Sequence, residues 1–265
     1  MRSFFNCKKM GKHFESKAVI VTGSSSGIGQ TTAVTFAKAG ASVVVHGRNE
    51  KGIQETIQLI EKAGVSKDRV AAVLGSLEEE KTLKQLVDTA IQKFGRIDVL
   101  VNAAGIGTKP NTPPESVENY DFVMNVNLKA PTFLTLLCVP HLEKTKGNIV
   151  NVSSIAGQIA TQMGFYGLAK AALDHSTRQF AITLAPKGIR VNTLSPGLVR
   201  TAFQERMMPG EGGKAFIDEF EKTIPVGRSG TPQEMADAIK YLAGPKAAYM
   251  TGQMIVQDGG TSLKH

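Results

Sequence analysis

Tyr166 and Lys170 stand four residues apart in residues 165–173 (FYGLAKAAL), where the other side chains are small or apolar. Positions four apart share one face of a helix, so the phenol and the ammonium would stand side by side. A cation ~5 Å away at an effective dielectric near 20 attracts a phenolate by about 3 kcal/mol, so we expect Lys170 to lower the pKa of Tyr166. Such a tyrosine can exchange a proton with a substrate oxygen. The pair alone also fits an amphipathic helix with a solvated lysine.

A glycine cluster lies near the start of the chain, in residues 22–29 (TGSSSGIG), between a β-branched run and a helical pattern. Glycines there let the backbone approach a pyrophosphate, and a helix N-terminus offers free amides to it. The same residues also fit G-x-S-x-G, with Ser25 as a hydrolase nucleophile. That alternative needs an acid and a histidine, but Asp174 and His175 are adjacent on one predicted helix and point apart. The dinucleotide interpretation is therefore favoured.

Strand-like and helical segments alternate along the chain. The predicted strands are residues 17–22, 41–47, 69–75, 97–105, 147–154, 188–197 and 252–260. The predicted helices are residues 28–40, 50–62, 78–94, 117–144 (interrupted by Pro131 and Pro140) and 166–185. This alternation predicts an α/β fold with a doubly wound parallel sheet of about seven strands and helices on both faces. We expect one domain over residues 17–265, with residues 200–225 forming either a lid over the site or a plain surface loop.

The composition narrows the class of protein. Of 265 residues, 42% are hydrophobic and 20% charged, as in a globular domain. Half of the net charge of +8 lies in residues 1–17, and no basic helix or aromatic-rich basic patch follows, which argues against nucleic-acid binding. Cys7 and Cys138 form neither a disulfide framework nor a zinc motif, so we expect no metal site and a reducing compartment.

Residues 1–16 carry basic residues and resemble a flexible leader, with a faint likeness to an organelle transit peptide. The longest apolar run, residues 132–140 (TFLTLLCVP), is too short to span a membrane. We therefore expect a cytoplasmic protein without a membrane span.

Five motifs occur in order: TGSSSGIG, NAAG at 102–105, NVSS at 151–154, Tyr166-x-x-x-Lys170 and SPG at 195–197. Together they resemble the short-chain dehydrogenase/reductase family over residues 17–263. The resemblance implies a single-domain Rossmann-type enzyme that passes hydride between a nicotinamide and a carbonyl or alcohol carbon.

The resemblance also implies catalytic roles. Tyr166 would be the general acid in reduction, and Lys170 would lower its pKa and hold the nicotinamide ribose. Ser154 would hydrogen-bond the substrate oxygen, because the family serine directly precedes an apolar-small-Gly run, here residues 155–157; Ser153 is the alternative.

Asn127 resembles the family asparagine that anchors a proton-relay water, and Asn125 is its nearby structural alternative. The presence of all four catalytic types argues against a nicotinamide-binding regulator without turnover, which stays a further alternative. Family members pair through long helices, so residues 117–144 and 166–185 are expected to form a homodimer or homotetramer.

The cofactor-binding residues implied by the resemblance are Gly23, Ser25, Gly27, Ile28, Gly29, Asn102, Ala103, Ala104, Tyr166, Lys170, Pro196, Gly197, Val199 and Thr201. The second strand ends in Gly47 and Arg48, where an acid would bind the ribose 2′-hydroxyl. A guanidinium there would clamp a 2′-phosphate, so we expect NADP(H). Arg48 as a solvated turn residue is the alternative. Ser76 stands where the family usually has an acid that contacts adenine, which predicts weaker adenine binding.

The residues expected beside the substrate are apolar: Ile106, Ile155, Met163, Phe165, Phe203, Met207 and Met208. They predict an apolar ketone or secondary alcohol as substrate, unless they only pack the core. The alternative substrate is a 3-oxoacyl thioester, for which Arg200 or Lys129 would have to bind the carrier's phosphate.

Overall fold

The computed structural model describes residues 13–161, 163–207 and 210–264. Most of the expected leader and Met208 lie outside the described residues. Phe14 is buried, and its ring centroid lies 4.8 Å from that of Phe36 in an edge-to-face contact. The packed structure therefore begins before residue 17, where the domain was expected to start.

Seven parallel strands form one sheet in the order β3-β2-β1-β4-β5-β6-β7. The strands are β1 (Ala18–Val21), β2 (Ser42–Gly47), β3 (Val70–Leu74), β4 (Val99–Asn102), β5 (Asn148–Val152), β6 (Arg190–Pro196) and β7 (Met254–Gln257). Their β-branched runs suit burial on both faces. Chain order reverses between β1 and β4, so the connections leave in opposite directions there and open a crevice at the carboxyl ends. The predicted doubly wound Rossmann-type fold is confirmed.

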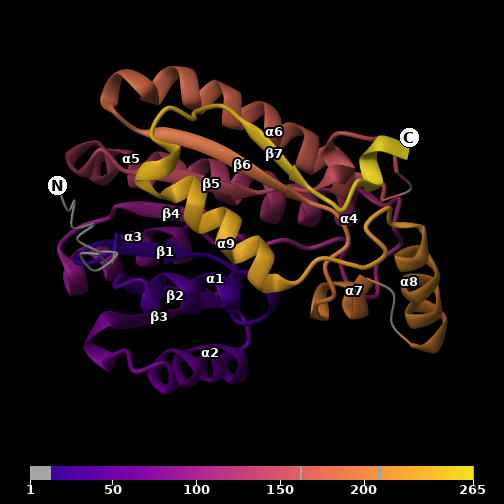
Figure 1. The fold of residues 1–265 in the computed structure, drawn as a ribbon, viewed down its shortest axis with the longest axis horizontal. Helices are drawn as coiled ribbons and strands as arrows, with labels where there is room; N and C mark the ends of the chain where they lie inside the picture. Colours follow the sequence, from indigo (N-terminus) through magenta and orange to yellow (C-terminus); the bar gives the residue numbers. More distant parts are fainter. Residues whose placement is uncertain (1–12, 162, 208–209, 265) are drawn as a thin grey trace, which may run out of the picture.

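Helices cover both faces of the sheet (Figure 1). One layer holds α1 (Gly27–Lys38), α2 (Glu50–Lys62) and α9 (Pro232–Ala243), and the other holds α3 (Glu80–Phe94), α4 (Val117–Met124), α5 (Ala130–Thr145) and α6 (Phe165–Leu184). Alternating residues of β1 show the division: Val19 and Val21 belong to the core cluster that contains Phe36 and Ile239, and Ile20 to the cluster behind the other face.

The α9 helix was missing from the expected elements. It begins with a capping box, in which the Thr231 hydroxyl accepts from Glu234 N–H and the Glu234 carboxylate accepts from Thr231 N–H. This is the usual signature of a helix N-terminus.

The predicted break of the long helix at its prolines is wrong. Residues Val117–Thr145 form one continuous helical stretch, with a π-helical turn over Asn125–Lys129. Pro131 lies in the first turn of α5, and Pro140 lies inside a helix that Leu134, Cys138 and Leu142 anchor in the core.

This stretch of 29 residues is long and apolar enough to cross a membrane by length and composition, since its most apolar 18-residue window has a mean hydropathy of 1.4. Of its most apolar window, 56% is buried within the fold, and α5 packs against α3, β4 and β5. The stretch therefore lies in the fold as a core helix.

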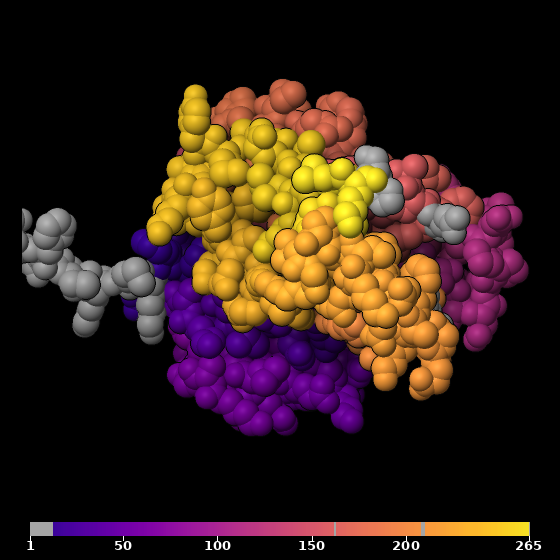
Figure 2. All heavy atoms as spheres, turned by 45° about the vertical axis from the view of Figure 1, so that its right-hand side comes forward, coloured from indigo at the N-terminus to yellow at the C-terminus, as the bar shows by residue number. Residues whose placement is uncertain are grey.

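The segment after β6 is mostly helical rather than irregular. It contains α7 (Ala202–Met207) and α8 (Glu211–Thr223), and we call these two helices the cover. Arg200 ties the start of the segment to α8 through Asp218 (2.6 Å) and Glu221. Figure 2 shows the cover, in orange, on the surface beside the yellow C-terminal residues.

Candidate active site

A cavity of about 1200 Å³ opens at the carboxyl ends of the strands, beneath the cover. It is lined from the β1–α1 loop, the ends of β2 to β6, α6, α7 and α8. This is the place where open parallel sheets bind ligands. The predicted site residues that line it are Gly23, Ser25, Gly27, Ile28, Gly29, Arg48, Ala103, Ala104, Ser154, Tyr166, Lys170, Pro196, Gly197, Val199 and Thr201.

The glycine loop lines part of the cavity with backbone atoms. Gly23 has φ +66°, and a Cβ there would lie 2.6 Å from the Cα of Ala104. A Cβ at Gly29 would overlap the carbonyl oxygen of Gly23, and no side chain in the described part of the chain caps the amides at the start of α1. Only glycine keeps this close packing, and the free amides of the helix N-terminus suit a pyrophosphate. The loop therefore fits a dinucleotide.

His46, which the sequence analysis did not single out, holds this loop in place. The Gly23 N–H donates to its Nδ1 (3.3 Å), and its Nε2 lies 3.3 Å from the Gly75 carbonyl oxygen. Burial lowers the pKa of His46 to about 4. The neutral ring then accepts at Nδ1 and donates from Nε2, so it links the loop to the end of β3.

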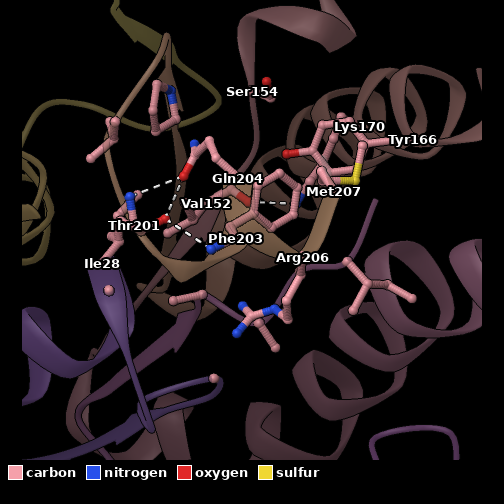
Figure 3. A pocket seen from close by; sticks show the side chains of 18 of the residues that line it. Ile28, Val152, Ser154, Tyr166, Lys170, Thr201, Phe203, Gln204, Arg206 and Met207 are labelled. Atoms are coloured by element: carbon pink, nitrogen blue, oxygen red, sulfur yellow. Dashed lines mark hydrogen bonds between the residues drawn. The ribbon is translucent and has the colours of Figure 1, made fainter. Parts of the chain in front are cut away.

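Tyr166 and Lys170 stand on α6 with their side chains buried in the cavity wall (Figure 3). The Lys170 ammonium donates to the Val152 carbonyl oxygen (2.8 Å) and lies 5.5 Å from the centroid of the Tyr166 ring. The expected side-by-side arrangement on one helical face is present.

The expected lowering of the tyrosine pKa is not found. Burial raises the pKa of Tyr166 to about 12, and the neighbouring Ser154 hydroxyl acts in the opposite direction. Burial also lowers the pKa of Lys170 to about 8. Loss of water disfavours both charged forms, and the sequence estimate had not counted this desolvation.

The two adjacent serines differ in orientation. The Ser153 hydroxyl donates to the carbonyl oxygen of Lys170 (3.3 Å), within the wall. The Ser154 hydroxyl accepts from Ala156 N–H (3.2 Å) and is a neighbour of the Tyr166 phenol. This geometry favours Ser154 over Ser153 as the group that meets a substrate oxygen.

Two predicted site residues lie beside the cavity rather than in its lining. The Asn127 amide donates to the carbonyl oxygens of Ile106 (2.8 Å) and Val123 (2.9 Å), and accepts from Ile106 N–H (3.1 Å). It sits in the π-helical turn and fixes the loop after β4. The Asn102 amide donates to Asn151 Oδ1 (2.8 Å) inside the sheet, so its side chain does not line the cavity.

Asp174 lies one helical turn beyond Lys170 and is buried. Among the described residues, neither of its carboxylate oxygens has a hydrogen-bond partner. Burial raises its pKa, and its charge in turn raises the pKa of Lys170.

The part of the cavity next to Tyr166 is apolar. Ile106, Ile155, Met163, Phe203 and Met207 all line it as expected, and α8 adds Phe216, Ile217 and Phe220. The Phe203 ring lies 5.6 Å from that of Tyr166, and Met207 packs so closely on Gly107 that a Cβ there would overlap its sulfur. Phe165 is not in the lining; its ring lies 5.1 Å from that of Tyr120.

Comparison with known proteins agrees with this geometry. The model of a family described as enoyl-(acyl carrier protein) reductase matches residues 23–262. A short-chain dehydrogenase/reductase of unknown function from Caenorhabditis elegans, solved with cofactor, is 42% identical, with a TM-score of 0.89 over 95% of this chain and 97% of that one. The chain belongs to the short-chain dehydrogenase/reductase (SDR) family.

Two further similar proteins have named activities. A glucose dehydrogenase of Caenorhabditis elegans, solved in its apo form, is 43% identical, with a TM-score of 0.83 over 94% of this SDR chain and 99% of that one. A 3-oxoacyl-(acyl-carrier-protein) reductase from Thermotoga maritima is 35% identical over 93% of this chain and 98% of its own length. This SDR chain is therefore an oxidoreductase of a family that uses a nicotinamide cofactor.

The cations of this SDR site are placed differently from expectation. Arg48 lines the cavity at the end of β2, but neither Arg200 nor Lys129 does. Arg206 of α7 does line it, and Figure 3 shows its guanidinium directed into the cavity. Sequence reasoning missed Arg206 because only the folded path of the cover brings it near β2.

Proposed function

We propose that this SDR enzyme uses NADP(H) to interconvert apolar ketones and secondary alcohols. The observation that carries the proposal is that one cavity is lined by proton-donating side chains, an apolar wall and an arginine. Tyr166 and Ser154 adjoin an apolar wall, and Arg48 stands at the end of β2 with no acid on that strand end. The glycine loop lines the same cavity.

In reduction, the chemistry that the cofactor supplies when bound is a hydride for the carbonyl carbon. Ser154 orients the substrate oxygen by donating a hydrogen bond. Tyr166 is a neutral phenol, because its pKa is raised to about 12, and it donates its proton to the oxygen as negative charge develops there. The Lys170 cation, 5.5 Å from the ring centroid, stabilises the tyrosinate until solvent returns the proton.

The cofactor preference rests on Arg48. A guanidinium binds a phosphate through charge-assisted hydrogen bonds worth roughly 1.5–3 kcal/mol each, whereas it gains little from a 2′-hydroxyl. No carboxylate pairs with Arg48 among the described residues, so it is available for an anion.

The substrate preference rests on the apolar wall and on the cations that are absent from it. Arg200 is held by Asp218 and Glu221, and Lys129 lies outside the lining, so neither supports binding of a carrier phosphate. Two of the similar proteins named above are a 3-oxoacyl-(acyl-carrier-protein) reductase and a glucose dehydrogenase. Both substrate classes therefore belong in the test.

The first experiment follows NADPH and NADH absorbance with aryl and cyclic ketones, a 3-oxoacyl thioester and, in the oxidative direction, glucose. The variants are Tyr166→Phe and Arg48→Ala. Tyr120→Phe is the matched control, because Tyr120 is half exposed and outside the cavity lining. We expect Tyr166→Phe to lower kcat about 10²- to 10⁴-fold and Tyr120→Phe to leave it unchanged.

Arg48→Ala should weaken binding of NADPH about 10- to 100-fold and leave binding of NADH nearly unchanged. Faster turnover of glucose or of the thioester than of any apolar ketone would overturn the proposed substrate class. Cofactor binding without turnover on any substrate would favour a regulator.

We also propose that the enzyme is a homo-oligomer. Large apolar side chains are exposed on the outer helices, including Phe133 of α5 (51%) and Leu168 and Ile182 of α6 (58% and 76%). Light scattering during size-exclusion chromatography tests this, and a monomer at micromolar concentration would contradict it.

A further inference from the structure

Two arginines from distant parts of the chain line the same cavity. Arg48 follows β2, and Arg206 comes from α7 of the cover. Within the described ranges neither guanidinium forms a hydrogen bond or an ion pair, whereas Arg200 and Arg228 are each paired with acids of α8 or α9. Glu205, the neighbour of Arg206 on α7, is the acid whose charge acts on it most directly.

Both side chains line one cavity and are partly exposed to solvent there. Partial desolvation, and after it the charge of Arg48, lowers the pKa of Arg206. Arg48 directly follows the carboxyl end of β2, and its charge also lowers the pKa of His46. Like charges brought together in a partly closed site repel each other, and an anion bound between them removes that cost.

We propose that Arg206 is a second ligand of the cofactor's 2′-phosphate, which binds between Arg48 and Arg206. This rests on the proposed preference for NADP(H) and extends it to the cover. A phosphate presents several oxygens, so two planar guanidiniums can each bind it in bidentate fashion. Arg48 alone is the residue that the sequence assigns to this group.

The proposed contact between Arg206 and the 2′-phosphate also connects the cofactor site to the substrate site through α7. Phe203 and Arg206 are three residues apart on α7 and therefore lie on one side of the helix. Phe203 packs on Tyr166, while Arg206 points into the cavity on the side away from Ser154 (Figure 3). Binding of the 2′-phosphate therefore holds α7, and with it the apolar wall, over the substrate position.

The test measures binding of adenosine fragments by calorimetry, without nicotinamide or substrate. Adenosine 2′,5′-bisphosphate and AMP differ only in the 2′-phosphate, and ADP adds the pyrophosphate. The variants are Arg206→Met and Arg206→Lys. Lys214→Met is the matched control, because it removes one positive charge from an exposed position of α8 outside the lining.

Arg206→Met should weaken binding of the bisphosphate about 10-fold and change that of AMP and ADP less than about twofold. Arg206→Lys should retain part of the affinity, and Lys214→Met all of it. Equal weakening of all three ligands, or of none, overturns the proposal. Wild-type protein that binds AMP as tightly as the bisphosphate overturns the NADP(H) preference itself, so the two failures are distinguishable.

Hydrogen exchange tests the connection to the cover. The bisphosphate, but not AMP, should slow amide exchange in α7 of the wild-type protein, and Arg206→Met should abolish this protection. Protection that persists in Arg206→Met would refute the role of Arg206 in holding the cover.

Discussion

Replacement of Lys170 by methionine should stabilise the cofactor-free protein at neutral pH while removing its activity. Lys170 is 2% exposed, and burial lowers its pKa from the ordinary 10.5 to about 8. At about 1.4 kcal/mol per pH unit, this difference makes the buried ammonium cost about 3 kcal/mol at pH 7. Methionine fills a similar volume without that cost, although it loses the hydrogen bond to Val152.

The dependence on pH has a definite sign. Between pH 8 and 10.5 the unfolded chain keeps the lysine proton that the folded chain has lost, so stability rises with pH. The stability that the fold gains from a neutral Lys170 is fully present above pH 10.5 and is lost as the pH falls through about 8. Tyr166 acts later: its raised pKa of about 12 favours the fold up to about pH 10, and this benefit is lost as the pH rises through 12.

Urea unfolding of the wild type and of Lys170→Met from pH 7 to 10.5 measures the effect. The difference in unfolding free energy between the two proteins should change by about 3 kcal/mol over this range. Lys246→Met, at an exposed lysine, should show a constant difference from the wild type. A constant difference for Lys170→Met as well would refute the assigned burial cost.

Two further substitutions test the site. Asp174→Asn removes the carboxylate that raises the pKa of Lys170. The alkaline limb of the pH profile of kcat/KM for ketone reduction should therefore move to lower pH. A limb that stays in place or moves to higher pH would contradict this. Gly23→Ala places a Cβ 2.6 Å from the Ala104 backbone, at a residue with φ +66°. This variant should lower the unfolding free energy by at least about 2 kcal/mol and weaken binding of the cofactor. Gly64→Ala is its control, with φ +80° and no atom within 4 Å; equal losses in both variants would leave no role for the close approach.

Much of the fold could be predicted because local pattern and tertiary packing agree. Residues 50–62 were expected as a helix and form α2 with the same bounds, since their apolar residues recur at helical spacing. The sheet followed from β-branched runs between helices. Residues 200–225 were misjudged because the glycines and proline in this part of the sequence indicate a loop, whereas contacts such as that of Arg200 with Asp218 stabilise helices there.

The site could be predicted wherever a motif fixes a residue's place relative to the sheet, as for Gly23, Ser154 and Tyr166. Motifs do not show the side-chain placements that tertiary contacts decide. Asn102 turns into the sheet toward Asn151, and Arg206 reaches the cavity only through the path of α7. The pKa of Tyr166 was misjudged because burial cannot be read from residue spacing.

The packing of α1 against α9 has a consequence for how the chain folds during synthesis. Gln233 of α9 donates to Thr35 of α1 (3.3 Å) across a separation of 198 residues. At about 5–20 residues per second, the ribosome takes roughly 10–40 s to make the intervening chain. Over that time the apolar side of α1 around Phe36 lacks its native partner. The nascent amino-terminal half is thus expected to depend on chaperone protection, and truncations before residue 232 to aggregate rather than fold.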